Sequence, residues 1–556
     1  MINEVSEQIQ SGELNNNRKP SPVQPLLFAL TLIAGMFIGT NLGDKNLLQV
    51  KPSVEQNANK LVSLIDFIED NYVDSIDKKQ LIEDAIASVL KNLDPHSYYM
   101  GSEEVALEKE RMKGEFSGVG IEFLILRDSL MVVKTIAGGP SEKAGLQSGD
   151  RIVMVDGNEI SGKELDGDKA QKLLKGKQGS QVNVTVIRPG EAAKKEFSIE
   201  RGSIPIESVN AAFMVNDSVG YMRIERFAEK TYDEFIEAAA VLEEKGCSSL
   251  ILDLRGNGGG LLNQAAEIVE EFLSEGKTIV RTRGIHTGED EIRSGKKGKY
   301  RDLNIVVMID QNSASASEIV AGALQDWDRA VTVGRRSFGK GLVQHEMELA
   351  DNSALRLTVA RYYTPTGRCI QKPYGDSIAY EGDFQKRLEK GEFTTADSVH
   401  FPDSLRFRTP SGRLVYGGGG IMPDVFVPLD SIYLSGLLSE IAYSGIIRNY
   451  CFTYLDSHRK EMRKYKSTDE FINKFNVSDA MLSGLIEMAE KEEIKINKQV
   501  VKKISTQLKS RIKGQFARSL FDDDAMVKVS LESDPDFKRA LQVAQDYKQF
   551  AAARKP

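Results

Sequence analysis

The sequence predicts an α/β domain that is interrupted by a smaller β-rich module and flanked by helical segments. From Ser218 onward, apolar runs of strand length alternate with segments of helical apolar spacing, which is the pattern of an α/β domain. Residues 116–200 instead combine glycine-rich turns with strand-like runs and one short helix. The chain before and after these two regions has helical periodicity.

Two motifs stand at the ends of expected strands. The expected strands cover residues 219–227, 249–254, 278–283 and 305–309, with more near residues 331, 343 and 355, and the expected helices cover 232–245, 262–273 and 317–327. A glycine-rich motif, Asp-Leu-Arg-Gly-Asn-Gly-Gly-Gly, spans residues 253–260, and a serine-rich motif, Asn-Ser-Ala-Ser-Ala-Ser-Glu, spans residues 312–318. Ligands of α/β domains bind outside the carboxyl ends of the strands, so both motifs are candidates for a functional site.

Length and composition exclude several classes of protein. A chain of 556 residues is too long for one ordinary domain and indicates three or four. The net charge of −8 comes without a long basic block, which argues against a nucleic-acid partner. Cys247, Cys369 and Cys451 are too few and too widely spread for a disulfide framework or a zinc cluster. We therefore expect no metal and no cofactor.

An uncharged apolar run over residues 26–42 is the candidate for a membrane segment, at the short end of the length that spans a bilayer. Arg18 and Lys19 precede it, so the positive-inside rule predicts a cytoplasmic tail over residues 1–25. A cleaved signal peptide is the alternative, but no small-x-small cleavage triplet follows the run. We expect a single-pass anchor in a bacterial inner membrane, with the rest of the chain in the periplasm.

The flanking regions are expected to be helical. Residues 53–115 predict two or three helices, one of which stops at Asp94-Pro95, because the residue before a proline is pushed out of the helical region. His96 in that turn is more typical of a local hydrogen-bonding residue than of a catalytic one. Residues 431–556 carry dense charge among apolar residues of helical spacing, which predicts a solvated helical appendage without chemistry of its own.

Ser315 lies where an expected strand gives way to a helix. The N–H groups of the first helical turn have no intrahelical partner and can stabilise an oxyanion, so the position suits a nucleophile. The alternative is that Ser315 and Glu318 form only a capping box. A serine nucleophile needs a neighbour that takes its proton, and a lysine does so only when burial keeps it neutral. Lys340, between two glycines and beside Phe338, is the candidate base.

The motifs taken in order resemble the carboxyl-terminal processing proteases, which are serine peptidases of family S41 with a Ser–Lys dyad. The resemblance rests on the two motifs above, on Phe338–Gln344 and on Gly417–Asp424, Gly-Gly-Gly-Gly-Ile-Met-Pro-Asp, and it extends from the apolar run to about residue 430. It implies an α/β protease core of crotonase-like βαβ units over residues 203–430, with a PDZ domain inserted over residues 116–202. The resemblance is compatible with either a monomer or a homo-oligomer.

The resemblance also implies roles for single residues. Ser315 is the expected nucleophile, Lys340 the general base, and Gln344 the amide that positions the lysine. If residues 340–344 were fully extended, their ends would lie roughly 13 Å apart at about 3.3 Å per residue, so the glycines have to bend the segment. His345 points to the opposite face of an extended strand and competes poorly with Gln344.

The expected oxyanion hole uses the N–H of Ala316 and an N–H of the Gly258-Gly259-Gly260 loop, with Gly259 and Gly260 as the expected donors. The family more often has Asn-Pro-Gly-Gly where this chain has Asn257-Gly-Gly-Gly. The missing proline leaves open which glycine donates.

The β-rich module resembles a PDZ domain through its glycine-rich start and the helix, glycine and strand of residues 140–152. In PDZ domains the glycine-rich loop offers N–H groups to a peptide's terminal carboxylate, while the peptide adds a strand to the sheet edge. The expected peptide-binding residues are Phe116, Ser117, Gly118, Val119, Gly120 and Ile121. The alternative is that the glycines only permit a tight turn.

Two other functions compete with a peptidase. Residues 334–341 match the GxxxxGK spacing of a P-loop, but Gly341 stands where a magnesium-binding Ser or Thr belongs, and no clear helix begins at Lys340. A non-catalytic PDZ scaffold would bind peptide ends without cutting them, and the presence of the whole catalytic set argues against it. We expect a membrane-anchored serine endopeptidase acting on proteins or peptides with free carboxyl termini.

Overall fold

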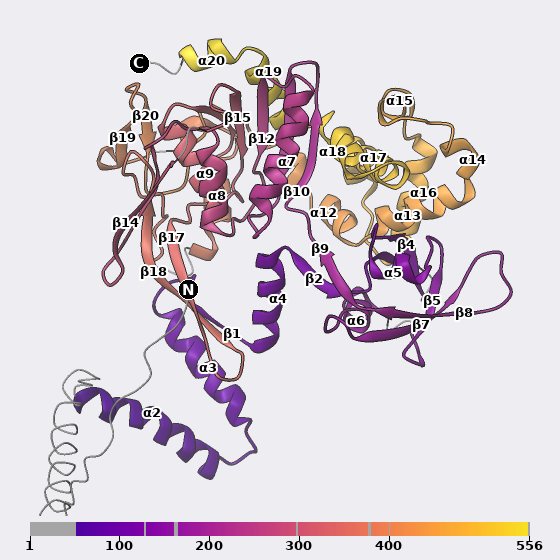
Figure 1. Cartoon of the computed structure of the whole chain (residues 1–556), viewed down its shortest axis with the longest axis horizontal. Coiled ribbons are helices and arrows are strands. Elements are labelled where there is room, and N and C mark those ends of the chain that lie inside the picture. Colours follow the sequence, from indigo (N-terminus) through magenta and orange to yellow (C-terminus); the bar gives the residue numbers. More distant parts are fainter. Residues whose placement is uncertain are drawn as a thin grey trace, which may run out of the picture. The chain divides into compact units, whose positions relative to one another are not determined.

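A computed structural model describes residues 52–126, 129–160, 165–295, 298–375, 380–399 and 401–553. The chain divides into two compact units, Met1–Ile86 and Ala87–Pro556. Helices expected near the N-terminus are α2 (Pro52–Asn71), α3 (Lys78–Lys91) and α4 (Ser102–Lys113), as labelled in Figure 1.

The structure corrects the predicted localisation. Throughout the described ranges, no helix combines the length and the apolar character that crossing a bilayer requires. The longest of these helices, α2 and α17 (Lys498–Leu520), carry charged side chains along their length. This finding contradicts the predicted single-pass anchor in an inner membrane. The apolar run of residues 26–42 and the tail of residues 1–25 themselves lie outside the described residues.

The core is a six-stranded sheet with the order β10-β11-β12-β15-β16-β21. Its strands are β10 (Val209–Met214), β11 (Val219–Ile224), β12 (Ser249–Asp253), β15 (Asn304–Ile309), β16 (Ala330–Gly334) and β21 (Val425–Phe426). All neighbours are parallel except β10 and β11. Strands β12 and β16 are buried throughout, because helices cover both faces of the sheet. The α/β core predicted from the alternating pattern is confirmed.

Different parts of the chain cover the two faces of this sheet. The first face packs against α7 (Thr231–Glu244), α8 (Leu262–Glu270) and α9 (Ala316–Asp326), which belong to the core itself. The opposite face packs against α18 (Asp523–Leu531) and α19 (Pro535–Gln545), through residues such as Phe537 and Val543. The C-terminal region is helical as expected, but these two helices are not a solvated appendage, because their apolar faces complete the core.

The helices between residues 436 and 520 form a core of their own. They are α12 (Gly436–Tyr443), α13 (Ile446–Ser457), α14 (Arg459–Met462), α15 (Thr468–Lys474), α16 (Asp479–Lys491) and α17. Their charged residues lie on the outer faces, which explains why the charge pattern in the sequence hid the buried side of these helices.

An antiparallel sheet with the order β1-β18-β13-β14 lies beside the core, and β17 pairs with β18. Its strands are β1 (Tyr98–Met100), β13 (Thr278–Gly284), β14 (Gly288–Arg293), β17 (Leu342–Glu348) and β18 (Ala354–Tyr363). Strand β17 begins directly after the segment with Lys340, so a strand rather than a helix follows this lysine. A P-loop requires a helix at that position.

The β-rich module has a sheet with the order β3-β4-β5-β7-β8, in which β3 is an edge strand. Its elements are β3 (Ile121–Leu126), β4 (Ser129–Thr135), α5 (Pro140–Ala144), β5 (Arg151–Val155), β6 (Asn158–Glu159), α6 (Gly167–Leu174), β7 (Gln181–Ile187) and β8 (Lys195–Glu200). Strands β2 (Glu115–Gly118) and β9 (Gly202–Pro205) run side by side as a separate antiparallel ribbon at the two ends of the module (Figure 1).

Candidate active site

A cavity of about 620 Å³ opens at the carboxyl ends of the parallel core strands. Its lining includes the whole set of catalytic and oxyanion candidates: Ser315, Ala316, Lys340, Gln344, Gly259 and Gly260. Residues from three separate chain segments therefore meet at the place where α/β domains bind their ligands.

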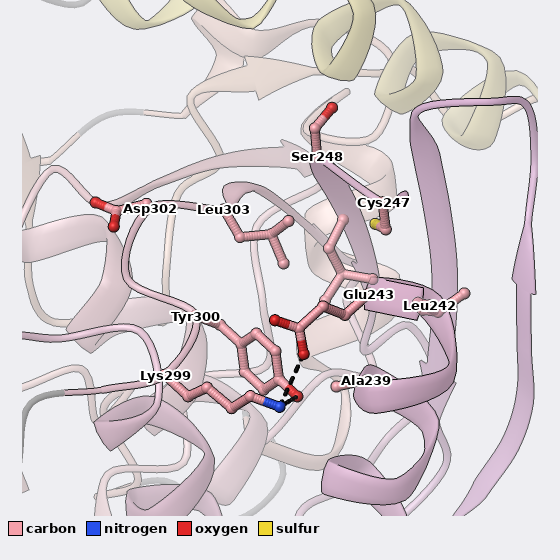
Figure 2. A pocket seen from close by; sticks show the side chains of 10 residues that line it. Ala239, Leu242, Glu243, Cys247, Ser248, Lys299, Tyr300, Asp302 and Leu303 are labelled. Atoms are coloured by element: carbon pink, nitrogen blue, oxygen red, sulfur yellow. Dashed lines mark hydrogen bonds and ion pairs between the residues drawn. The ribbon is translucent and has the colours of Figure 1, made fainter. Parts of the chain in front are cut away.

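Figure 2 shows a second, smaller cavity of about 260 Å³ that lies near the opposite ends of the strands, beside Ser248 and Leu303. The Lys299 ammonium group points at the Glu243 carboxylate, with 2.8 Å between nitrogen and oxygen. Burial raises the pKa of the Cys247 thiol, which disfavours a nucleophilic thiolate. We assign no activity to this cavity. Within the described residues, no group of three or more His, Cys, Asp or Glu is placed to hold a metal ion.

Ser315 occupies a strained backbone position at the start of α9. Its φ of 56° and ψ of −114° lie in a region that residues other than glycine rarely adopt. The glycine-rich loop packs tightly against it, because a Cβ atom at Gly259 would lie 2.7 Å from the Ser315 Cβ and 3.0 Å from the Ala316 nitrogen. Glycine at position 259 is thus required for the loop to approach the serine.

The other two serines of the motif serve the fold. The Ser313 hydroxyl donates to the carbonyl of Leu254 at 2.8 Å, and the Ser317 hydroxyl donates to the carbonyl of Asn257 at 2.9 Å. Both side chains are buried, and the cavity lining includes neither. Ser315 is the serine of this motif that reaches the cavity.

Glu318 joins the Ser315 turn to the Lys340 loop. Its Oε2 atom accepts the N–H of Ser315 at 2.9 Å and the N–H of Lys340 at 2.8 Å. Its Oε1 atom accepts the Ser337 hydroxyl at 2.5 Å and the N–H of Gly339 at 2.8 Å. Burial raises the pKa of this carboxyl to about 7. The capping interaction expected as an alternative for Ser315 is present, and it coexists with exposure of Ser315 to the cavity.

Tyr362, on β18, makes a second link between the same two segments. Its hydroxyl lies 3.0 Å from the carbonyl oxygen of Ser315 and also contacts the carbonyl oxygen of Lys340. Burial raises the pKa of Tyr362 well above its ordinary value, so the hydroxyl stays protonated and can donate. Nothing in the sequence pattern indicated this residue, because its contact depends on the pairing of β18 with β17.

Lys340 lies in surroundings that favour its neutral form. Burial lowers the pKa of its ammonium group, and the positive charge of Arg356 lowers it further, against smaller opposing effects of Glu318, Glu108 and Asp94. Arg356 also lines the cavity, where its guanidinium donates to the Tyr98 hydroxyl at 2.8 Å. The sequence predicted a buried lysine but not the arginine beside it.

Gln344 enters the cavity through an irregularity in β17. The register of β17 against β18 shifts between Val343 and Gln344, so that both residues line the cavity. The Gln344 amide donates to the carbonyl of His96 at 3.1 Å. His345 is exposed and lies outside the lining.

His96, which the sequence did not place in the site, is adjacent to it. One ring nitrogen lies 2.6 Å from the Tyr380 hydroxyl. Burial, and then the charge of Lys340, lower the pKa of His96 to about 4, so the ring is neutral at ordinary pH. No local pattern distinguishes this histidine from a turn residue.

The hydrogen bonds of the glycine-rich loop reduce the number of N–H groups that could stabilise an oxyanion. The N–H of Gly259 donates to the Asn257 side-chain oxygen at 2.8 Å, so it is already engaged. Gly260 has a φ of 142°, and a Cβ atom there would lie 2.1 Å from the carbonyl oxygen of Phe227. Ala316 and either Gly258 or Gly260 remain as candidates, all of which line the cavity.

The expected peptide-binding residues of the β-rich module fall into two groups. Phe116, Ser117 and Gly118 lie in β2 and pair with β9, outside the main sheet of the module. The chain from Val119 to Ile121 then leads into the edge strand β3. Gly120 has a φ of 73°, and a Cβ atom there would lie 2.8 Å from Ile204, so a tight turn requires this glycine. That turn does not conflict with carboxylate binding by the same segment.

Family models match four parts of the chain. Residues 218–377 match peptidase family S41, residues 131–188 a PDZ domain, and residues 34–104 the activating protease CtpB N-terminal domain. Residues 437–522 match DUF8443, a family of unknown function.

Related proteins agree with these matches. A carboxy-terminal-processing protease from Bartonella bacilliformis is 38% identical over 348 residues, which cover 61% of this chain and 79% of the relative. The carboxy-terminal processing protease CtpB from Bacillus subtilis is 33% identical over 358 residues, which cover 61% and 72%. Among solved structures, a photosystem II D1 C-terminal processing protease is 30% identical, with a TM-score of 0.31, over 57% of this chain and 85% of that chain.

Proposed function

We propose that this chain, which belongs to peptidase family S41 and is a serine-type peptidase with a PDZ domain, is an endopeptidase with a Ser315–Lys340 dyad. Its proposed substrates are proteins presented by their carboxyl ends. One observation carries this proposal. Ser315 and Lys340 line the same cavity, and one oxygen of the buried Glu318 accepts the backbone N–H of both.

In the proposed reaction, neutral Lys340 takes the hydroxyl proton of Ser315 as Oγ attacks the scissile carbonyl carbon. The resulting oxyanion accepts hydrogen bonds from the N–H of Ala316 and of one glycine of the loop. The Lys340 ammonium then gives its proton to the leaving amine, and an ester to Ser315 remains. Water attacks this ester, Lys340 takes its proton and returns it to Ser315, and the carboxyl product leaves.

The environment of Lys340 supports its role as a base. A lysine in water is protonated at neutral pH and cannot accept a proton. Burial and the charge of Arg356 both lower the pKa of Lys340, which increases the fraction of neutral amine. Gln344 lies in β17, which follows Lys340, and its amide is held by the carbonyl of His96. In the proposed mechanism this amide helps to position the lysine.

The edge of the PDZ domain supports the proposed choice of substrate. Strand β3 pairs with β4 on one side only, so its other edge can accept an extended peptide as an additional strand. The segment from Val119 to Ile121 precedes this edge, where backbone N–H groups would bind the terminal carboxylate. A substrate would therefore be recognised by its free carboxyl end and cut in the core.

The decisive experiment compares wild type with Ser315→Ala on one unfolded protein substrate, with cleavage followed by mass spectrometry. Wild type should cut and Ser315→Ala should not, while both have the same circular dichroism spectrum and thermal midpoint. Cleavage by Ser315→Ala at the wild-type rate, in a preparation free of other proteases, would show that Ser315 is not the nucleophile.

A further inference from the structure

The N-terminal end of α19 contacts the strand ends that carry the active-site loops. Asp536, near the start of this helix, is only 4% exposed and lies outside every segment that a family model matches. Phe537 and Val543 of the same helix pack on the sheet face opposite α9. The start of α19 therefore reaches the catalytic edge of the sheet from the face that the core helices leave open.

Asp536 forms a two-bond ion pair with Arg335, which follows β16 and leads to Lys340. The two guanidinium nitrogens each donate to one carboxylate oxygen at 2.8 Å. Both side chains are buried, with 7% and 5% of their surface exposed. The remaining nitrogen of Arg335 donates to the side-chain oxygen of Gln311, in the turn before Ser315, at 3.1 Å.

The same carboxylate contacts the glycine-rich loop through Arg255, which follows β12. Arg255 lies 3.3 Å from Asp536 and 2.8 Å from Asp534, which caps the start of α19. Its other side binds Asp253 at the end of β12, at 2.7 Å. Asp536 is thus joined to the loop of Gly258 to Gly260 as well as to the segments of Ser315 and Lys340.

We propose that Asp536 is a positioning residue that holds the glycine-rich loop, the Ser315 turn and the Lys340 loop in register. The desolvation cost of a buried ion pair can offset its attraction, so we assign this pair the role of fixing the geometry of the groups it joins. Removing the carboxylate leaves the buried Arg335 guanidinium without its ion-pair partner, so that it must turn toward other acceptors. It also removes one of the three carboxylates around Arg255, which keeps Asp253 and Asp534. A shift of about 1 Å in a catalytic loop costs about a hundredfold in rate.

This inference rests on the proposed dyad, so its test contains a measurement that does not depend on cleavage. Asp536→Asn keeps the shape of the side chain and removes its charge. Val543→Ala is the matched control, because Val543 packs α19 on the same sheet through an apolar side chain that cannot form an ion pair with either arginine. Both variants are assayed with a short peptide substrate, at a temperature well below the unfolding of either.

We expect kcat of Asp536→Asn to fall at least about tenfold with KM nearly unchanged, since the loops bind substrate but no longer align. Val543→Ala should lower the thermal midpoint and keep kcat within about twofold of wild type. If Asp536→Asn is unstable, the double variant Arg335→Gln with Asp536→Asn leaves no unpaired charge at this pair and should show the same loss of kcat.

Hydrogen exchange tests the positioning role of Asp536 independently of activity. Asp536→Asn should lose amide protection in residues 255–260 and 336–341, and Val543→Ala should not. Unchanged protection in both loops, or an equal loss of kcat in the two variants, would overturn the positioning role. If Ser315→Ala still cleaves in the same assay, the proposed dyad fails, while the exchange data still show whether Asp536 holds the loops.

Discussion

The side-chain amide of Gln344 donates to the backbone carbonyl of His96 at 3.1 Å, which joins strand β17 to the turn that precedes β1. The two residues are 248 positions apart in the chain. Gln344 also lines the cavity that Lys340 lines, so this bond fixes an amide in the same cavity as the proposed base.

Gln344→Ala should therefore lower kcat by about 10- to 100-fold, because Lys340 loses the neighbour that steadies it. The measurement is steady-state cleavage of a peptide at several pH values. His345→Ala is the control, since His345 is the next residue on β17, is exposed and does not line the cavity. Equal kinetics for the two variants would argue against a positioning role for Gln344.

The proposed dyad predicts non-additive losses. Ser315→Ala and Lys340→Ala should each abolish measurable cleavage, and the double variant should be no worse than either, since residues that act as one unit are strongly non-additive. Ser313→Ala and Ser317→Ala should retain measurable activity, because these hydroxyls bind backbone carbonyls rather than face the cavity. A Lys340→Ala enzyme with wild-type kcat would exclude this lysine as the base.

The charge of Arg356 should set the pH range of activity. Activity should rise with pH as Lys340 loses its proton. Arg356 disfavours the protonated lysine, so Arg356→Gln should raise the pKa of Lys340 and move the rise in kcat to higher pH. Arg361→Gln on the same strand is the control, because Arg361 bonds to Tyr374 and lies outside the cavity lining. A shift to lower pH would contradict this account.

Much of the fold could be predicted because local apolar spacing reports strands and helices. The helix expected at residues 317–327 and the strand at 305–309 agree with α9 and β15 to within a residue. Tyr362 and Asp536 could not be predicted, because their contacts depend on strand pairing and on a helix from a distant part of the chain. The dense charge around residues 523–545 also concealed that α18 and α19 cover the core sheet.

The buried Glu318 should make stability depend on pH. Its pKa is raised from 4.5 to about 7 in the folded state by burial, so the folded protein holds this proton more tightly than the unfolded chain. The contribution is fully present below pH 4.5 and is lost as pH rises through about 7, with a size of about 3 kcal/mol.

Glu318→Gln should remove this dependence and also lower activity, since an amide NH₂ cannot accept the N–H groups that the second oxygen accepts. The measurement is chemical denaturation of wild type and variant between pH 4.5 and 8. The difference between wild type and Glu318→Gln in free energy of unfolding should change with pH across this window. A constant difference would mean that Glu318 does not titrate there.

Recognition by the PDZ domain should depend on a free carboxyl group. The edge strand β3 pairs only with β4 in its sheet, and the backbone from Val119 to Ile121 leads into it. Amidating the terminus of a substrate peptide removes its charge and should weaken binding by about 1.5–3 kcal/mol for each lost charge-assisted bond. Ser315→Ala protein allows fluorescence-anisotropy titration without cleavage. The control is a peptide of the same sequence in which a side-chain carboxyl near the amino terminus is amidated and the terminal carboxylate is intact, and it should bind as the parent does. Equal affinity of the terminally amidated peptide and the parent would rule out carboxylate recognition at this edge.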